Sequence, residues 1–482
     1  MNLKPNVLFL LLDGIRADKF YGDNKSSLTP NLDLLLKKGT YFSQAVASAP
    51  STVPAVSSIM TSLYPHKALI KDNNLYRINL SKKNFPTLFK KNGYNTYCTF
   101  QEAIEFLGLE KIFDNSDSYS NFSFLWNGLS EKILEQFEKN LLKEPWLYYL
   151  HLYDLHLLAF TYEERKKFAP TEFNNKKFGV NQYEQFISAI DRCLGKILEK
   201  IDLEETIIVT TSDHGSEYGV YDDELQKIND ENIELRRHKQ GSLFKISHKA
   251  ALTLPPALLP IRKKLSAFYN DKTFQNTRKK MKHIVNDVEK QDVSPYRKRL
   301  LKQSAWLSGD VEPLLYDDRF RIPILFTGWN FPEGKIVEEQ VRSIDIFPTL
   351  ADILGIEFDK DIHGRSLISL INKKEHDIPA FLEGAVNAPK FISKEWVGIR
   401  IPEFKYFRSK NMSNDKPYLF DLINDPNEEH NIANKNKSQV DKMEKILTDF
   451  LQGKDFKHDE IHESSDEESL KIESELRKLG YM

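Results

Sequence analysis

The chain has 482 residues, of which 40% are hydrophobic and 29% are charged, and its formal net charge is -2. This length is enough for a large buried core, and it allows two to four domains or one large α/β unit with a smaller appendage. The near-neutral charge gives no indication of nucleic-acid binding. Two cysteines exclude both a disulfide scaffold and a cysteine-rich zinc site.

The N-terminal apolar segment is the first candidate for a targeting sequence. Residues 7–12 are apolar, but the run ends at Asp13. It is too short to span a bilayer and has no small-residue cleavage site after it. Because no other stretch approaches about 20 apolar residues, we expect neither a signal peptide nor a transmembrane segment. The expected location is therefore the cytoplasm.

Three continuous apolar segments are predicted to be buried parallel strands. Each strand ends at a polar cluster, and helical patterns alternate with the strands, which predicts a doubly wound α/β sheet with a site at its carboxyl edge. The strands are residues 6–12, 146–153 and 206–212, and they lead to Asp13, to Asp154 with His156, and to Asp213 with His214. The predicted helices between them are residues 29–39, 87–93, 131–142 and 183–201.

The segment 50–66, PSTVPAVSSIMTSLYPH, is predicted to contain a buried helix with Pro54 at its first position. This places Thr52 just ahead of the helix N-terminus, where free N–H groups and the helix dipole favour an anion. Two interpretations of Thr52 remain open. It is either an ordinary helix cap or a nucleophile whose hydroxyl is activated by a metal.

The second half of the chain has a less regular pattern. Residues 221–307 are rich in Lys and Arg, and we interpret them as an insertion that is a lid over the site, a protein-contact element or a solvated surface segment. A core strand at 321–327 and a helix at 344–354 follow. We expect a catalytic domain at 1–371, a smaller α+β subdomain at 372–452 and a charged tail at 453–482. The elements expected in the subdomain are strands 380–383, 396–401 and 404–407 and a helix at 440–451.

Several segments, in this order along the chain, resemble the sulfatase family within the alkaline phosphatase superfamily. They are PNVLFLLLDGIRAD, STVPAVSSIMTSLYPH, HLYDLH, SDHGSEYG, LLYDDRFRIPILFTG, VRSIDIFPTLADILGI and YLFDLINDPNEEHNIA. Each segment alone is weak evidence, whereas together they follow the order of the family and cover nearly the whole chain except the insertion. The resemblance implies an alkaline-phosphatase-like mixed sheet flanked by helices, with a smaller C-terminal subdomain that contains an antiparallel sheet.

The resemblance also implies a divalent metal at the strand ends. Asp13, Asp213 and His214 match metal-ligand positions, and Thr52 matches the nucleophile, which also contacts the metal. Carboxylates suit Ca²⁺, Mg²⁺ or Mn²⁺, and the histidine favours Mn²⁺ or Zn²⁺. His156 matches a histidine that contacts the substrate or protonates the leaving group. The remaining candidates near the substrate, and the only further ligands for a second metal, are Asp154, His151 and His156.

Departures from the family pattern bear on the substrate. Sulfatases carry Cys or Ser, converted to formylglycine, at the position of Thr52, and an Arg at the position of Val56. Threonine cannot form that aldehyde, so we expect no formylglycine. Gly14 follows Asp13 where sulfatases usually have a second Asp. The segment GDVEPLLYDD has no basic residue, whereas sulfatases usually have a Lys or His just before the corresponding stretch. Threonine is the nucleophile of the superfamily's phosphotransferases and phosphodiesterases, which favours a phosphoester.

The leading hypothesis is a metal-dependent hydrolase or transferase that cleaves a phosphate or sulfate ester through a covalent intermediate on Thr52. The substrate is expected to be a small molecule or a glycan or lipid ester, and the acceptor is water or an alcohol. The first alternative is a sulfatase that works without formylglycine. The second is a sulfatase-like protein that has lost turnover and serves in binding, which the missing Arg, Lys and second Asp favour.

Overall fold

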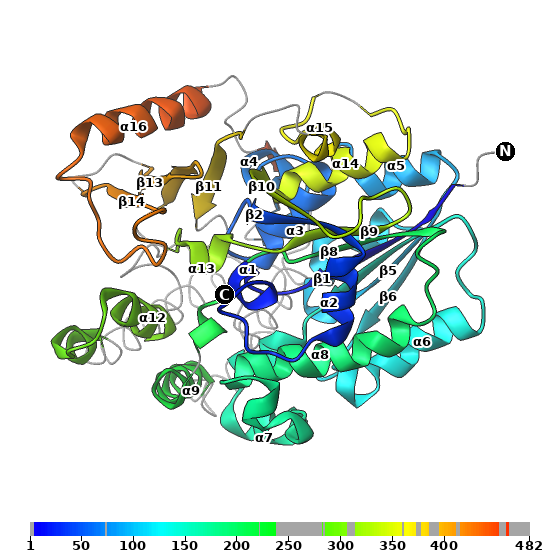
Figure 1. The fold of residues 1–482 in the computed structure, drawn as a ribbon, viewed down its shortest axis with the longest axis horizontal. Helices are drawn as coiled ribbons and strands as arrows, with labels where there is room; N and C mark the ends of the chain where they lie inside the picture. Colours follow the sequence, from blue (N-terminus) through cyan, green and yellow to red (C-terminus); the bar gives the residue numbers. More distant parts are fainter. Residues whose placement is uncertain are drawn as a thin grey trace, which may run out of the picture.

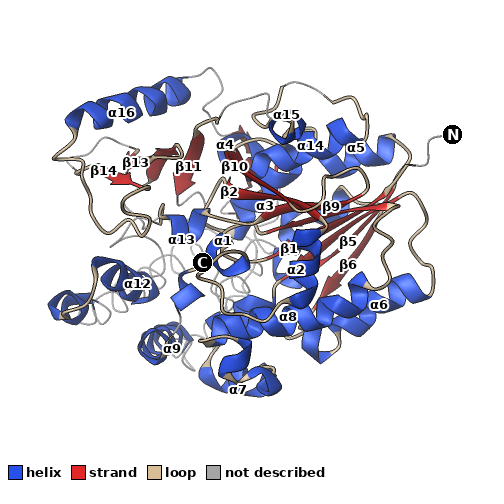
Figure 2. Ribbon diagram, viewed as in Figure 1, coloured by secondary structure: helices blue, strands red, loops and turns tan. Residues whose placement is uncertain are grey.

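A mixed β-sheet with helices on both faces forms the centre of the molecule (Figures 1 and 2). The computed structural model describes residues 4–72, 75–220, 222–237, 282, 285–305, 314–358, 361–372, 377–384, 395–410, 415–452 and 459–461. In this part of the chain the sheet has eight strands in the order β10-β2-β9-β8-β1-β7-β5-β6. Only β9 runs antiparallel to its neighbours there. The strands are β1 Asn6–Leu12, β2 Gly39–Val46, β5 Asn95–Gln101, β6 Asn115–Tyr119, β7 Trp146–Leu152, β8 Thr206–Thr211, β9 Ile324–Gly328 and β10 Lys335–Arg342.

The alternation of side chains along β1 divides the core into two layers. Val7, Phe9 and Leu11 pack with residues of α3, α5 and α14, whereas Leu8 and Leu10 pack with α2, α6 and α8 on the opposite face. A strand covered on both faces is apolar at every position, which is why β1 shows no polar alternation. These helices are α2 Pro30–Lys37, α3 Thr52–Thr61, α5 Phe85–Lys91, α6 Leu129–Glu138, α8 Gln182–Leu198 and α14 Ile346–Ile353.

Two smaller sheets complete the fold. An antiparallel sheet in the order β11-β12-β13-β14 packs against α16 and forms a separate hydrophobic cluster around Met443 and Leu447. The short strand β15 adds in parallel to the β3–β4 hairpin. The elements are β3 Leu69–Asp72, β4 Leu75–Ile78, β11 Ala380–Gly384, β12 Trp396–Arg400, β13 Phe404–Ser409, β14 Tyr418–Asp421, β15 Asp459–Ile461 and α16 Lys437–Gln452.

Short helices connect these layers. In the described part of the chain they are α1 Ala17–Phe20, α4 Pro65–Ala68, α7 Tyr162–Phe168, α13 Asp317–Phe320 and α15 Ile368–Ile371. Two further helices, α9 Asp223–Arg237 and α12 Pro295–Ala305, lie in the predicted insertion and contact each other. Residues 238–281 of that insertion fall outside the described residues. No helix among the described residues is both long enough and apolar enough to cross a membrane.

The predicted fold class, a mixed α/β sheet with a smaller C-terminal sheet, is confirmed. The three predicted strands appear within one residue of their expected ends, because continuous apolar runs mark buried strands well. One prediction needs a change, since the doubly wound pattern did not include the reversed strand β9. The domain boundaries at 371 and 452 stay a prediction, although β11 to β14 and α16 lie between them.

The helix at 50–66 starts two residues earlier than predicted. Ser51 is the N-cap, with extended backbone angles of φ -151° and ψ 156°, and Thr52 is the first helical residue. Pro54 is therefore third and not first. A proline is tolerated there because none of the first N–H groups of a helix has an intrahelical partner. The shift brings the Thr52 side chain onto the helix itself.

Candidate active site

Three adjacent strands bring the predicted polar clusters to one edge of the sheet. In the order β8-β1-β7, Leu11 pairs with both Thr211 and His151, so the three strands end side by side. Their carboxyl ends carry Asp13, Asp213 with His214, and, after β7, His156. Carboxyl ends of parallel strands are the usual location of ligand sites in α/β folds.

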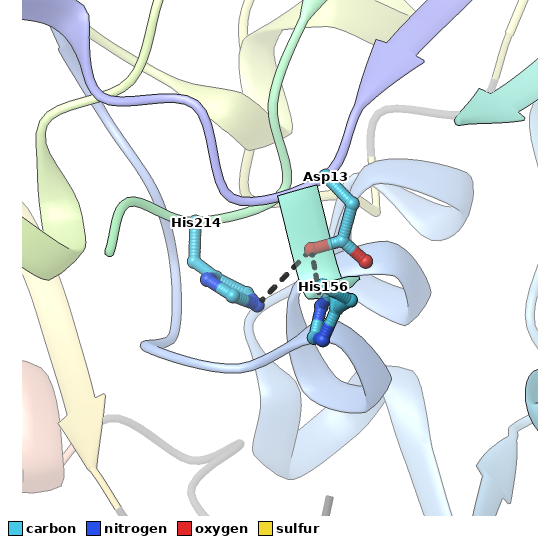
Figure 3. A group of neighbouring side chains, drawn as sticks. All are labelled: Asp13, His156 and His214. Atoms are coloured by element: carbon cyan, nitrogen blue, oxygen red, sulfur yellow. Dashed lines mark hydrogen bonds and ion pairs between the residues drawn. The ribbon is translucent and has the colours of Figure 1, made fainter. Parts of the chain in front are cut away.

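Asp13 lies at the centre of the cluster and is 1% exposed. Its Oδ1 atom lies 3.0 Å from His156 Nε2 and 3.7 Å from His214 Nε2 (Figure 3). Its Oδ2 atom lies 3.1 Å from His151 Nε2 and accepts a hydrogen bond from Thr52 Oγ1 at 3.3 Å. Both oxygens of this one carboxylate are therefore within reach of imidazole nitrogens.

Thr52 reaches the cluster from the first turn of α3. Its hydroxyl lies 3.2 Å from His214 Nε2, and the residue is 1% exposed. The α3 helix packs against the face of the sheet to which Leu11 and the paired His151 belong. The helix N-terminus thus adds its unpaired N–H groups and positive dipole end to the site.

The β8 end supplies Asp213 and His214, both buried. His214 Nδ1 lies 2.7 Å from the carbonyl oxygen of Gly215. A carbonyl can only accept, so Nδ1 carries the hydrogen and neutral His214 has its lone pair on Nε2, facing Asp13 and Thr52. Asp213 Oδ1 accepts from the Gly14 amide at 3.3 Å, which ties the ends of β8 and β1 together.

The two histidines of the β7 end differ in depth. His151 lies within the strand, is 1% exposed, and has its Nδ1 3.1 Å from the Tyr149 hydroxyl. The His156 side chain is 18% exposed and stacks on Tyr153 with ring centroids 4.5 Å apart. Both rings nevertheless direct Nε2 at Asp13, which sequence spacing alone could not show.

Asp154 is the predicted site residue that the structure places apart. Its Oδ1 atom accepts from the Leu125 amide at 2.6 Å, and the residue is 2% exposed. Burial raises the pKa of Asp154 to about 7. Within the described residues no hydrogen bond or ion pair joins it to Asp13. The role of Asp154 in substrate binding stays a prediction.

The charges of the cluster are strongly coupled. Burial alone would raise the pKa of Asp13, but the nearby His156, His151 and His214 hold it well below its usual value. Burial and the neighbouring Asp13 raise the pKa of Asp213. Burial opposes protonation of His156, but Asp13 outweighs it and raises the pKa of this imidazole. Two buried carboxylates this close create a strong demand for a cation.

Two supporting residues were not identified from the sequence. Tyr149 contacts His151, and Ser212 donates to the carbonyl of His214 at 2.7 Å while it accepts from the Ile15 amide at 3.1 Å. The sequence could have indicated Tyr149, because it lies two residues before His151 and residues two apart on a strand share a face. Nothing in the sequence distinguished Ser212 from other strand-end serines.

The residues present fit a divalent metal ion. Two triads of donor atoms lie within 4.8 Å of one another, Asp13 with His156 and His214, and Asp13 with His151 and Asp213. Imidazole and carboxylate together suit zinc or manganese, whereas calcium prefers six to eight oxygen ligands. Fold and cluster thus define an α/β protein with a candidate metal-binding site at the carboxyl edge of its sheet.

Comparison with known families agrees with this class. Residues 5–356 match the Sulfatase family model, and residues 312–454 match the model of the N-sulphoglucosamine sulphohydrolase C-terminal region. The first match covers most of the chain, so the chain belongs to the sulfatase family. Members of this family are hydrolases that act on sulfuric esters and bind a divalent metal. This assignment favours an enzyme over the binding-protein alternative.

Two distant relatives align with nearly the whole chain. The chain is 22% identical to the "Arylsulfatase" of Clostridium perfringens over 488 residues, covering 94% of this chain and 95% of the relative. It is 22% identical to the "Sulfatase" of Formosa agariphila over 490 residues, covering 92% and 86%.

Among solved structures, two complexes show the same fold. Ps i-CgsB in complex with k-i-k-neocarrahexaose superposes with a TM-score of 0.59 and 18% identity, covering 98% of this chain and 97% of that one. A protein bound to its substrate D-glucosamine-2-N,6-O-disulfate superposes with a TM-score of 0.61 and 15% identity, covering 94% and 98%. These structures support the fold of the chain along nearly its whole length.

Proposed function

We propose that this protein is a metal-dependent hydrolase or transferase that cleaves a phosphoester through a covalent ester on Thr52. The observation that carries the proposal is the position of the Thr52 hydroxyl, 3.3 Å from Asp13 and 3.2 Å from His214 at the start of α3. A hydroxyl buried among metal-ligand side chains at a helix N-terminus is suited to attack an anionic ester.

The alternatives to Thr52 as nucleophile lie elsewhere. Ser51 is the N-cap of α3, and its carbonyl accepts from the Ala55 amide at 3.2 Å. Cys98 is buried in β5, and Cys193 lies in α8. Thr52 is thus the hydroxyl that reaches both Asp13 and His214, and threonine does not supply a formylglycine aldehyde.

The reaction follows from this arrangement in two displacements. Thr52 Oγ1 forms a bond to phosphorus as the bond from phosphorus to the substrate's alcohol oxygen breaks, and the alcohol leaves with a proton. Water or a second alcohol then attacks phosphorus, the bond to Thr52 Oγ1 breaks, and the hydroxyl regains its proton. A bound divalent metal would lower the pKa of the hydroxyl and neutralise charge on the transferred group.

A sulfate ester is the second candidate, because the family match favours it. The same two displacements apply, with sulfur in place of phosphorus. The alcohol part of either ester is proposed to be a sugar, since two proteins of similar fold were solved with carbohydrates.

The test compares Thr52→Ala, Thr52→Ser and Ser51→Ala with the wild-type enzyme on aryl phosphate, aryl phosphodiester and aryl sulfate. We expect Thr52→Ala to lose turnover by about 10³-fold or more and to lose the covalent adduct, which is located by mass spectrometry of the trapped protein. Thr52→Ser should retain the adduct, because it keeps a hydroxyl. The matched control Ser51→Ala should behave like wild type.

Different outcomes separate the two candidates. Turnover and an adduct with both phosphate esters but not with the sulfate would support phosphoryl transfer. Turnover of aryl sulfate alone through Thr52 would select the sulfate ester. An adduct on Ser51, or an aldehyde at any residue, would contradict the proposed nucleophile.

A further inference from the structure

Two helices of the insertion, α9 Asp223–Arg237 and α12 Pro295–Ala305, pack against each other (Figure 1). The first of them carries Asn229, a polar residue that is only 6% exposed. We propose that Asn229 is a positioning residue, which holds the loop that carries His156 against the loop that carries His214. This inference rests on the proposed function for its activity readout, whereas its structural readout does not depend on the chemistry.

The first contact of Asn229 is with the loop after β7. Its Nδ2 atom donates to the carbonyl oxygen of Leu158 at 3.0 Å. Leu158 and His156 belong to the same 3₁₀ turn, Asp154–Ala159, in which the His156 amide donates to the carbonyl of Tyr153 at 2.9 Å. The bond from α9 therefore fixes this turn two residues after His156.

Arg165 on α7 ties the same loop to α9 a second time. Its Nη1 atom donates to the carbonyl oxygens of Leu158 and Phe160 at 3.4 and 2.5 Å, and its Nη2 atom donates to Asp230 Oδ1 at 2.6 Å. Arg165 is 2% exposed, so these bonds lie away from water, where a lost partner is costly. The loop is thus held by α9 directly through Asn229 and indirectly through Asp230.

The second contact of Asn229 is with the loop after β8. A carbonyl can only accept, so the amide atom that faces Leu158 is the nitrogen, and the oxygen is left for another partner. Asn229 Oδ1 lies 3.5 Å from the hydroxyl of Tyr218, which can donate to it. Tyr218 is four residues after His214, in the segment SDHGSEYG. One buried amide therefore links the loops that carry His156 and His214.

The helix α12 extends this support to the loop after β1. The hydroxyl of Tyr296 accepts a hydrogen bond from Arg16 Nη1 at 3.1 Å, and Arg16 is three residues after Asp13. The next residue of α12, Arg297, pairs with Asp222 at the start of α9 at 2.6 Å. The helix pair α9–α12 therefore contacts the loops after β1, β7 and β8, whose carboxyl ends form the candidate active site.

A role of α9 in covering the core does not by itself explain a polar residue at position 229. The helix packs Leu225 and Ile228 into the hydrophobic cluster that contains Leu158. An apolar side chain at position 229 would cover this cluster as well, whereas a buried amide is costly unless its polar atoms are hydrogen-bonded. The contacts of Asn229 with Leu158 and Tyr218 meet that requirement, and they connect two loops of the site.

The activity test compares Asn229→Ala and Tyr218→Phe with wild type and with the matched control Lys227→Ala, an exposed residue of the same helix. We expect Asn229→Ala to lower kcat about 10- to 100-fold and to leave KM within about 2-fold, because a misplaced His156 impairs the reacting geometry more than binding. Tyr218→Phe should lower kcat less. The two effects should not add, because both substitutions break the same link. Lys227→Ala should behave like wild type.

Amide hydrogen exchange measures the loop without any turnover. Asn229→Ala should speed exchange in residues 154–160 by about 10-fold and leave exchange in β1 unchanged. Tyr218→Phe removes a single hydroxyl and should loosen residues 216–220 in the same way. This milder variant keeps the comparison decisive where Asn229→Ala does not fold.

The contrary results are specific. Unchanged exchange in both loops, equally faster exchange in β1, or a raised KM with an unchanged kcat would each overturn the positioning role. A failure of the proposed function has a different signature. Wild type that cleaves none of the esters, or Thr52→Ala that keeps turnover, would reject the proposed function, and the exchange of residues 154–160 would still decide whether α9 holds the loop.

Discussion

Replacement of Asp13 by asparagine is expected to abolish turnover, by about 10⁴-fold or more, and to weaken metal binding by more than about 100-fold. Asparagine has nearly the same shape, but it has no charge and offers one oxygen. Asp13 uses both oxygens, one toward His156 and His214 and the other toward His151 and Thr52. The other ligands would remain, but the group that links them would not.

The effect of Asp13→Asn is measured as kcat/KM on the aryl ester that the wild-type enzyme cleaves best, and as metal affinity by competition with a chelator. The matched control is Asp117→Asn, because this carboxylate is 43% exposed and pairs with Lys132 on the surface. We expect the control to stay within about 2-fold of wild type. An Asp13→Asn enzyme that keeps its metal and its turnover would show that the cluster is not the active site.

Asp317→Ala is expected to destabilise the fold by about 3–5 kcal/mol. Asp317 begins α13 and accepts hydrogen bonds from Arg400 Nε at 3.1 Å and Nη2 at 3.0 Å, and it pairs with Lys405. Arg400 and Lys405 belong to the C-terminal sheet and are 1% and 0% exposed. Removal of the carboxylate leaves two buried cations short of a partner at the junction of the two sheets.

The pH dependence of this effect has a definite sign. Burial opposes ionisation of Asp317, but Arg400 and Lys405 outweigh it and hold its pKa well below the unfolded value of about 3.9. Its contribution is complete above about pH 4 and is lost as the pH falls toward the folded pKa. Burial instead raises the pKa of Glu428, the other carboxylate near Lys405, so Asp317 carries the acid-dependent part.

Urea unfolding of wild type and Asp317→Ala at pH 7 and at pH 3 checks both statements. The difference in the free energy of unfolding between wild type and Asp317→Ala should be larger at pH 7 than at pH 3. Asp449→Ala serves as the control, because Asp449 and Lys445 form a pair on α16 that is 62% and 75% exposed. Its effect should stay below about 0.5 kcal/mol. Equal effects of the two substitutions would contradict the role of the Asp317 network.

Local patterns along the chain are enough to predict the main strands and the polar residues at their ends. Continuous apolar runs identified β1, β7 and β8, because a strand covered on both faces has no polar positions. The rule that parallel strands collect ligands at their carboxyl ends then selected five residues, namely Asp13, Asp154, His156, Asp213 and His214. Both predictions use only the types of residues that are close together in the sequence, so they do not require knowledge of the fold.

Which of those side chains meet depends on how distant segments of the chain pack together. Strand order places β8, β1 and β7 together, and this order depends on contacts between residues far apart in the sequence. It brings His151 to Asp13 and leaves Asp154 against Leu125, although both lie near the end of β7. Adjacent residues of a strand point to opposite faces, but the direction of a side chain in the turn after the strand depends on the turn geometry. Sequence spacing therefore could not show whether His151 or Asp154 faces Asp13.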